Sequence, residues 1–106
     1  MARARELFDE LAAEQLARPE VSLGTMLRGD GLTVEGKVYA FLSKGEGLVV
    51  KLPAERVAEL TSQGAARQVV MGARTMREWV ELPQPDETLW RRAMTEAAAY
   101  VRQLAS

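Results

Sequence analysis

The sequence predicts an α+β fold: an antiparallel β-meander of four to five strands flanked by an N-terminal helix, a short middle helix and a long C-terminal helix. Short β-rich runs in the first half of the chain are joined by glycine turns too short for a crossover helix, which indicates antiparallel strands. Amphipathic segments at both ends indicate helices. The chain has 106 residues, and we expect residues 1–106 to form a single domain.

The first helix is expected over residues 3–17. Leu7, Leu11 and Leu16 recur on one side of it at helical spacing, whereas the opposite side is mainly acidic. Pro19 ends this helix, because proline cannot donate a backbone hydrogen bond. This pattern predicts a helix laid on an apolar surface.

The strands of the meander follow directly. They are expected at Val21–Leu27, Leu32–Val34, Lys37–Ser43 and Leu48–Leu52. Asp30-Gly31 and Glu35-Gly36 predict tight hairpin turns, which need positive φ angles. The run Lys37–Ser43 is apolar on both faces, so we expect a central strand that is covered on both sides.

The second half of the chain predicts helix, strand, helix. Residues 52–64 form the short helix, with Pro53 in its first turn and Gly64 as its C-terminal cap. After a basic loop, the run "REWVEL" at residues 77–82 predicts the last strand. Asp86 is expected to cap the last helix.

The composition limits the chemistry of the protein, since the chain has no histidine and no cysteine. Serine–histidine catalysis, cysteine–histidine catalysis and thiolate metal sites are therefore excluded within this chain. We expect a protein that is not an enzyme and holds no cofactor. Asp30, Glu35 and Glu46 lie at turns without the spacing of a calcium loop, so no metal site is predicted.

Charge and hydropathy limit the partners. Fourteen basic and fifteen acidic side chains give a net charge of −1, which disfavours nucleic-acid binding. Direct DNA contact by Arg91 and Arg92 together with the basic loop is a weaker hypothesis. The chain has no apolar run of membrane-spanning length and no signal-like N-terminus, so we expect a cytoplasmic protein without a membrane contact.

The segment "VVMGARTMREWVEL" at residues 69–82 supports two interpretations. In the first it is a site for a small anionic ligand, with arginine charge, backbone N–H groups, a threonine hydroxyl and a neighbouring tryptophan. The residues of this candidate anion site are Arg67, Gly72, Arg74, Thr75, Arg77 and Trp79. In the second interpretation Met71, Met76 and Trp79 anchor a loop in the core, and the arginines are solvated or paired.

Lys51 ends an aliphatic strand just before Pro53. A desolvated lysine there could act as a nucleophile or base. The alternative is a salt bridge to Glu35, Glu78 or Glu81.

The terminal helices suggest a partner. The last helix is apolar even at Ala97, Ala98 and Ala99, and such a flank could seat a second helix closely. A homodimer through the terminal helices and simple packing on the chain's own sheet are both open.

The stretch "GTMLRGDGLTVEGKVYAFLSKGEGLVVKLPAERVAEL", followed by a methionine-bearing loop and "MREWVEL", resembles the N-terminal domain of the TfoX/Sxy family. The matching positions are Met26, Gly31, Gly36, Phe41, Lys51 and Leu52. The resemblance implies a small α+β domain with an antiparallel sheet. Because the best-known members regulate bacterial competence by acting with a transcription factor, it also implies a regulatory or adaptor role through protein–protein contacts.

Overall fold

The computed structural model describes residues 3–26 and 29–105. The described residues form three helices, α1 (Arg3–Leu16), α2 (Ala54–Ser62) and α3 (Glu87–Ala105). Their six strands are β1 (Val21–Met26), β2 (Gly29–Val34), β3 (Lys37–Leu42), β4 (Leu48–Lys51), β5 (Arg67–Met71) and β6 (Arg74–Leu82). The predicted α+β class is confirmed, and the sheet has six strands in place of four or five.

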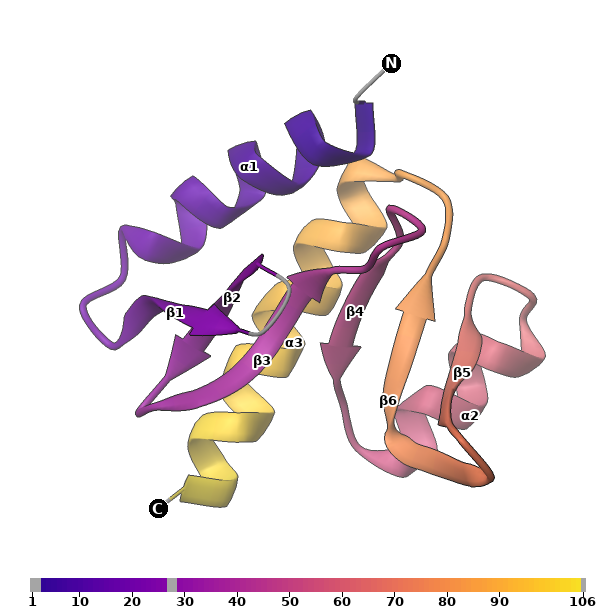
Figure 1. Ribbon diagram of the computed structural model, residues 1–106. Helices are drawn as coiled ribbons and strands as arrows, with labels where there is room; N and C mark the ends of the chain where they lie inside the picture. The colour runs from indigo at the N-terminus through magenta and orange to yellow at the C-terminus, as the bar shows by residue number, and fades with distance from the viewer. Residues whose placement is uncertain (1–2, 27–28, 106) are drawn as a thin grey trace.

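The strands form a sheet in the order β1-β2-β3-β4-β6-β5, with every neighbouring pair antiparallel. The meander from β1 to β4 is therefore confirmed. Helix α2 then carries the chain to β5 at the edge of the sheet, and β6 returns between β5 and β4 (Figure 1).

The turns of the meander agree with the prediction in one case and differ in another. Glu35 and Gly36 have φ angles of 52° and 79°, as expected for a two-residue hairpin turn. The turn at Asp30-Gly31 is wrong, because β2 already begins at Gly29 and Gly31 pairs with Gly24 of β1. Leu27, the last residue of the strand predicted at Val21–Leu27, lies outside the described residues.

The helix ends follow the predicted chemistry. The amide of Ala65 donates to the Leu60 carbonyl and that of Gly64 to the Thr61 carbonyl, with Gly64 at φ 79°. This is the Schellman pattern for which glycine is the favoured residue. At the start of α3, the Leu89 amide donates to Oδ1 of Asp86 over 3.0 Å, so Asp86 is an N-cap.

The three helices cover the same face of the sheet. Buried apolar side chains of α1, α2 and α3 form one cluster with Ala40, Val50 and Val80, which are cross-strand neighbours. Figure 1 shows α3 running behind β3 and β4. Arg56 of α2 donates to Glu96 of α3 over 2.9 Å, which joins these two helices on that face.

The prediction that the strand at residues 37–43 is covered on both sides is wrong. β3 is central, but Phe41 is outside the helix-side cluster and its ring lies beside Trp79, so it is on the face that the described helices leave open. The register shifts from Leu32↔Ala40 to Thr33↔Val38, so Tyr39 is an extra residue in a β-bulge. The bulge turns Tyr39 toward the helices, where it is fully buried beside Ala40.

No helix in the described part of the chain is long and apolar enough to cross a membrane.

Candidate functional site

The segment predicted as a basic loop is a β-hairpin, and this is the main difference between prediction and structure. β5 and β6 pair from Val69↔Met76 to Met71↔Arg74, with Gly72 and Ala73 as the two turn residues. Gly72 has a φ of 63°, and hairpin turns of type II′ need glycine at this first turn position.

The end of this hairpin exposes apolar side chains. Val70 is 58% exposed and Met71 65% exposed. The packing interpretation is therefore wrong for Met71, which cannot anchor the segment in a core. Methionine is a common residue of protein contact surfaces, because its flexible thioether adapts to irregular partners.

Four of the predicted anion-site residues lie together. Arg74, Thr75, Arg77 and Trp79 line a hollow of about 440 Å³ in the surface, and Lys51, Met76 and Glu78 complete its lining. In the described part of the chain, no carboxylate forms an ion pair with Arg74 or Arg77. The hollow carries three cationic side chains against one carboxylate, so it attracts anions.

The other two predicted residues do not join the hollow. Arg67 pairs with Glu81 across the β5–β6 ladder, and its Nε donates to Oε1 of Glu81 over 3.1 Å. The turn residue Gly72 is not among the residues that line the hollow. Arg67 therefore does not converge with Arg74 and Arg77 at the hollow.

Lys51 replaces Arg67 as the third cation. β4 pairs with β6 so that Lys51 is opposite Trp79, and Nζ lies 5.8 Å from the centroid of the indole ring. Nζ also lies 3.9 Å from Oε1 of Glu78, which fits the salt-bridge alternative for this lysine. Oε2 of Glu78 in turn accepts a hydrogen bond from the Tyr100 hydroxyl over 2.9 Å.

The open face of the sheet, which we define by Phe41, Val49, Lys51, Trp79 and Glu81, adjoins this hollow. These residues are cross-strand or next-but-one neighbours, and they alternate with the buried row that faces the helices. The rings of Phe41 and Trp79 lie 6.1 Å apart and are half-buried. Val49 is only 4% exposed although it is not part of the helix-side cluster, so this face holds a small aromatic cluster of its own.

A polar network on the open face was not predicted from the sequence. The Ser43 hydroxyl donates to Oε2 of Glu81 over 2.6 Å and accepts from the Gly47 amide over 3.0 Å. Glu81 also accepts from Arg67, so its carboxylate joins the β3–β4 turn to β5. Both bonding directions of the serine are used in holding the turn, which favours a structural role.

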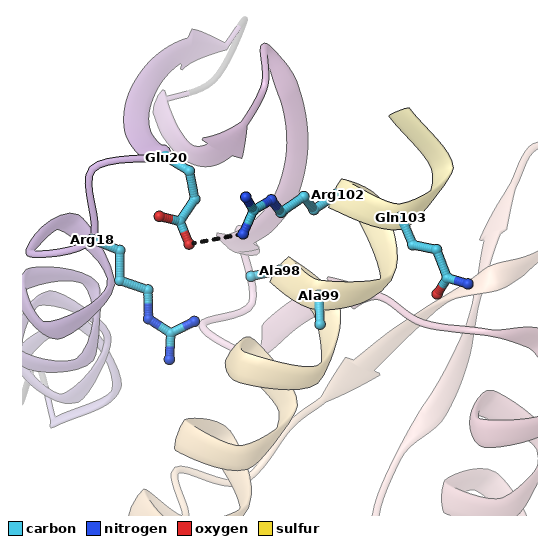
Figure 2. Close-up of a pocket in the computed structure, with 6 residues that line it drawn as sticks. All are labelled: Arg18, Glu20, Ala98, Ala99, Arg102 and Gln103. Atoms are coloured by element: carbon cyan, nitrogen blue, oxygen red, sulfur yellow. Dashed lines mark ion pairs between the residues drawn. The ribbon is translucent and has the colours of Figure 1, made fainter. Parts of the chain in front are cut away.

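A second hollow, of about 320 Å³, lies where α1 leads into β1 beside α3 and was also not predicted. Figure 2 shows Arg18 and Arg102 reaching into it from opposite sides with Glu20 between them. Arg102 lies 3.8 Å from carboxylate oxygens of both Glu20 and Glu35. Because these acids offset the arginine charge, this hollow is a weaker anion site than the first.

The terminal helices pack within the chain. Ala97 and Ala98 are buried in the core, and Ala99 is exposed. Most of the alanine flank is therefore already used, which favours intramolecular packing over a helix-mediated homodimer. Arg91 donates to both carboxylate oxygens of Glu14 over 2.9 Å, which joins α3 to α1. It therefore forms no basic patch with the hairpin.

The bond from Arg91 lowers the pKa of Glu14.

The described acidic and other metal-binding side chains form no group of three that could hold a metal ion. Of the turn acids, Glu35 lies at the β2–β3 turn and Glu46 at the β3–β4 turn, and the side chain of Asp30 lies outside the described residues.

Comparison of the chain with protein-family models, with curated proteins and with solved structures gives no match.

Proposed function

We propose that this protein is a small cytoplasmic adaptor or regulatory domain that acts through protein–protein contacts and has no enzymatic activity. The contact surface in this proposal is the hairpin surface, which we define by Val70, Met71, Arg74, Arg77 and Trp79.

One observation carries the proposal: exposed large apolar side chains lie next to cations without acidic partners among the described residues. Val70 and Met71 are more than half exposed, and Arg74 and Arg77 follow them across the hairpin turn. Methionine, arginine and aromatic residues are enriched in protein interfaces, and apolar patches rimmed by charge mark interaction sites. The surface therefore suits a partner that offers apolar side chains and carboxylates.

The resemblance to the TfoX/Sxy N-terminal domain supports the same class of function, because its best-known members act with a transcription factor. The absence of histidine and cysteine supports a role without catalysis.

Site-specific photocrosslinking in cells of the source organism tests the proposal. A photoreactive amino acid at Met71 should give a discrete crosslinked protein. The matched control is Leu104, which is 53% exposed but lies near the end of α3. Charge reversal by Arg74→Glu with Arg77→Glu should abolish the Met71 crosslink. Equal products from Met71 and Leu104, or a crosslink indifferent to charge reversal, would contradict the proposal.

A second candidate function is binding of a small anionic ligand in the hollow lined by Lys51, Arg74 and Arg77. Its volume of about 440 Å³ suits a small molecule, and its charge suits phosphate or carboxylate groups. Inorganic phosphate should then raise the melting temperature by mass action. The double variant Arg74→Ala with Arg77→Ala should lose that rise, and an equal rise in wild type and variant would exclude the site.

A further inference from the structure

Among the described residues, the sheet ends at β5, and no strand pairs with its outer edge. β5 is the last strand in the sheet order and pairs on one side with β6. In the described part of the chain, the backbone hydrogen bonds outside regular elements include none from Arg67–Met71. An unpaired edge is a ready template for a further strand, and lysine and proline are the usual safeguards. The sequence of β5, RQVVM, contains neither, and its one charged residue, Arg67, is bonded to Glu81.

The hairpin turn identifies which backbone groups are available. Met71 and Arg74 flank the two-residue turn, so their backbone groups bond to each other across it. Hydrogen-bonding direction alternates along an antiparallel strand. The N–H and C=O of Val70 therefore point away from β6, toward the free edge.

Charge decides what kind of strand can pair there. No acidic residue occurs between Glu59 and Glu78, whereas this stretch contains Arg67, Arg74 and Arg77. A second copy of β5 would bring like charges together, and the acidic α1 of a second copy is helical and cannot supply a strand. An extended segment with carboxylates complements this edge. β1, at the opposite edge, has no charged residue with which to make this selection.

We infer that the free edge of β5 binds an extended acidic segment of another protein by strand addition, with the Val70 backbone as its central hydrogen-bonding pair. This inference rests on the proposed adaptor function and names the chemistry of its partner. Main-chain bonds supply affinity in such complexes, and side-chain contacts supply specificity. Because side chains alternate between the two faces of a strand, the carboxylates of the segment lie on the face that Met71 shares with its cross-strand neighbour Arg74, and its apolar residues lie on the face of Val70.

Amide hydrogen exchange by NMR on the full chain tests the inference, with a blocked peptide that alternates glutamate and valine as the probe. At a peptide concentration about ten times its Kd, exchange of the Val70 amide should slow roughly tenfold. The amide of Met71, already bonded to β6, should change much less. A peptide with lysine in place of glutamate should leave Val70 unchanged.

Two variants sharpen the result. Val70→Pro removes the outward donor at an edge position, where proline is tolerated, and should abolish binding. Val70→Thr keeps the backbone donor and should bind. If Val70→Pro fails to fold, an alternately N-methylated peptide makes the same test from the probe's side, since it lacks the donors that pair with the Val70 carbonyl.

Three outcomes of the exchange experiment would overturn the inference. They are equal protection by acidic and basic peptides, protection of Val70 without any peptide through self-association, and no protection at ~1 mM peptide, where a Kd of ~1 mM would leave half the protein bound. Peptide shifts confined to Phe41 and Trp79 would also overturn it. That last outcome leaves the adaptor proposal standing, because the photocrosslink at Met71 is independent of strand addition.

Discussion

The Tyr39 hydroxyl donates a hydrogen bond of 2.6 Å to Oε1 of Gln15, and both side chains are buried. This bond joins the bulge of β3 to the last turn of α1, which are far apart in the sequence. A buried polar pair of this kind is favourable only while both partners are present, since each alone would be desolvated without compensation.

Tyr39→Phe is expected to destabilise the fold by about 1–3 kcal/mol, because the Gln15 amide oxygen stays buried without its donor. Urea unfolding measures the free energy of unfolding directly. Adding Gln15→Leu should recover part of the loss, since the double variant no longer buries an unpaired polar group. Strict additivity of the two single losses would contradict a coupled pair.

The same tyrosine predicts a loss of stability at alkaline pH. Burial raises the pKa of Tyr39 above its ordinary value of 10, and Arg18 opposes this shift. The folded state therefore keeps a proton that the unfolded chain releases near pH 10, so this contribution is complete below that pH and falls as pH rises above it. Urea unfolding from about pH 8 to about pH 11 should show a shallower decline for Tyr39→Phe than for wild type. Equal declines would exclude Tyr39 as the cause.

Local chemistry explains which parts of the fold could be predicted. The turn at Glu35-Gly36, the cap at Gly64 and the N-cap at Asp86 each depend on a few neighbouring residues, so short sequence patterns are sufficient. The missed strand β5 has no such pattern. Val70 and Met71 are both largely exposed, and the strand forms because β6 pairs with it rather than because it buries an apolar face.

Only part of the candidate site could be predicted from the sequence. Arg74, Thr75 and Arg77 lie together because they are close in sequence. The presence of Lys51 and the departure of Arg67 depend on the order β4-β6-β5, which places Lys51 opposite Trp79 and Arg67 opposite Glu81. The bulge at Tyr39 also depends on a distant partner, Gln15, so strict alternation along β3 could not reveal it.

Trp90 gives a prediction about the core. Its ring is fully buried, and Nε1 has no hydrogen-bond partner among the described residues. A buried unpaired N–H is unfavourable, so Trp90→Phe should lose packing but remove this penalty, with a net change of about 1 kcal/mol or less. Trp90→Ala should destabilise by about 3–5 kcal/mol because it leaves a large cavity. If Trp90→Phe lost as much stability as Trp90→Ala in thermal or urea unfolding, removal of the unpaired N–H would bring no gain and the prediction would be wrong.

The cations of the hollow should be dispensable for folding. Arg74→Ala and Arg77→Ala are each expected to change the free energy of unfolding by no more than about 0.5 kcal/mol, since both side chains are exposed and form no ion pair with described residues. A matched contrast is Glu81→Ala, which removes a carboxylate that is 17% exposed and bonds both Ser43 and Arg67. Its loss in urea unfolding should be clearly larger. A large loss for either arginine variant would mean that its charge serves the fold rather than a partner.

Gly47 should resist substitution because Glu81 occupies the space beside it. A Cβ at this position would lie 2.8 Å from Cγ and 2.9 Å from Cδ of Glu81, closer than carbon atoms pack, so the carboxylate would have to leave Ser43. Gly47→Ala is therefore expected to cost about 1–3 kcal/mol in urea unfolding. Gly45→Ala in the same turn is the control, since its Cβ would meet the Ser43 hydroxyl at 4.0 Å and nothing nearer. If both variants lose the same stability, backbone freedom of the turn and not the position of Glu81 explains the glycine.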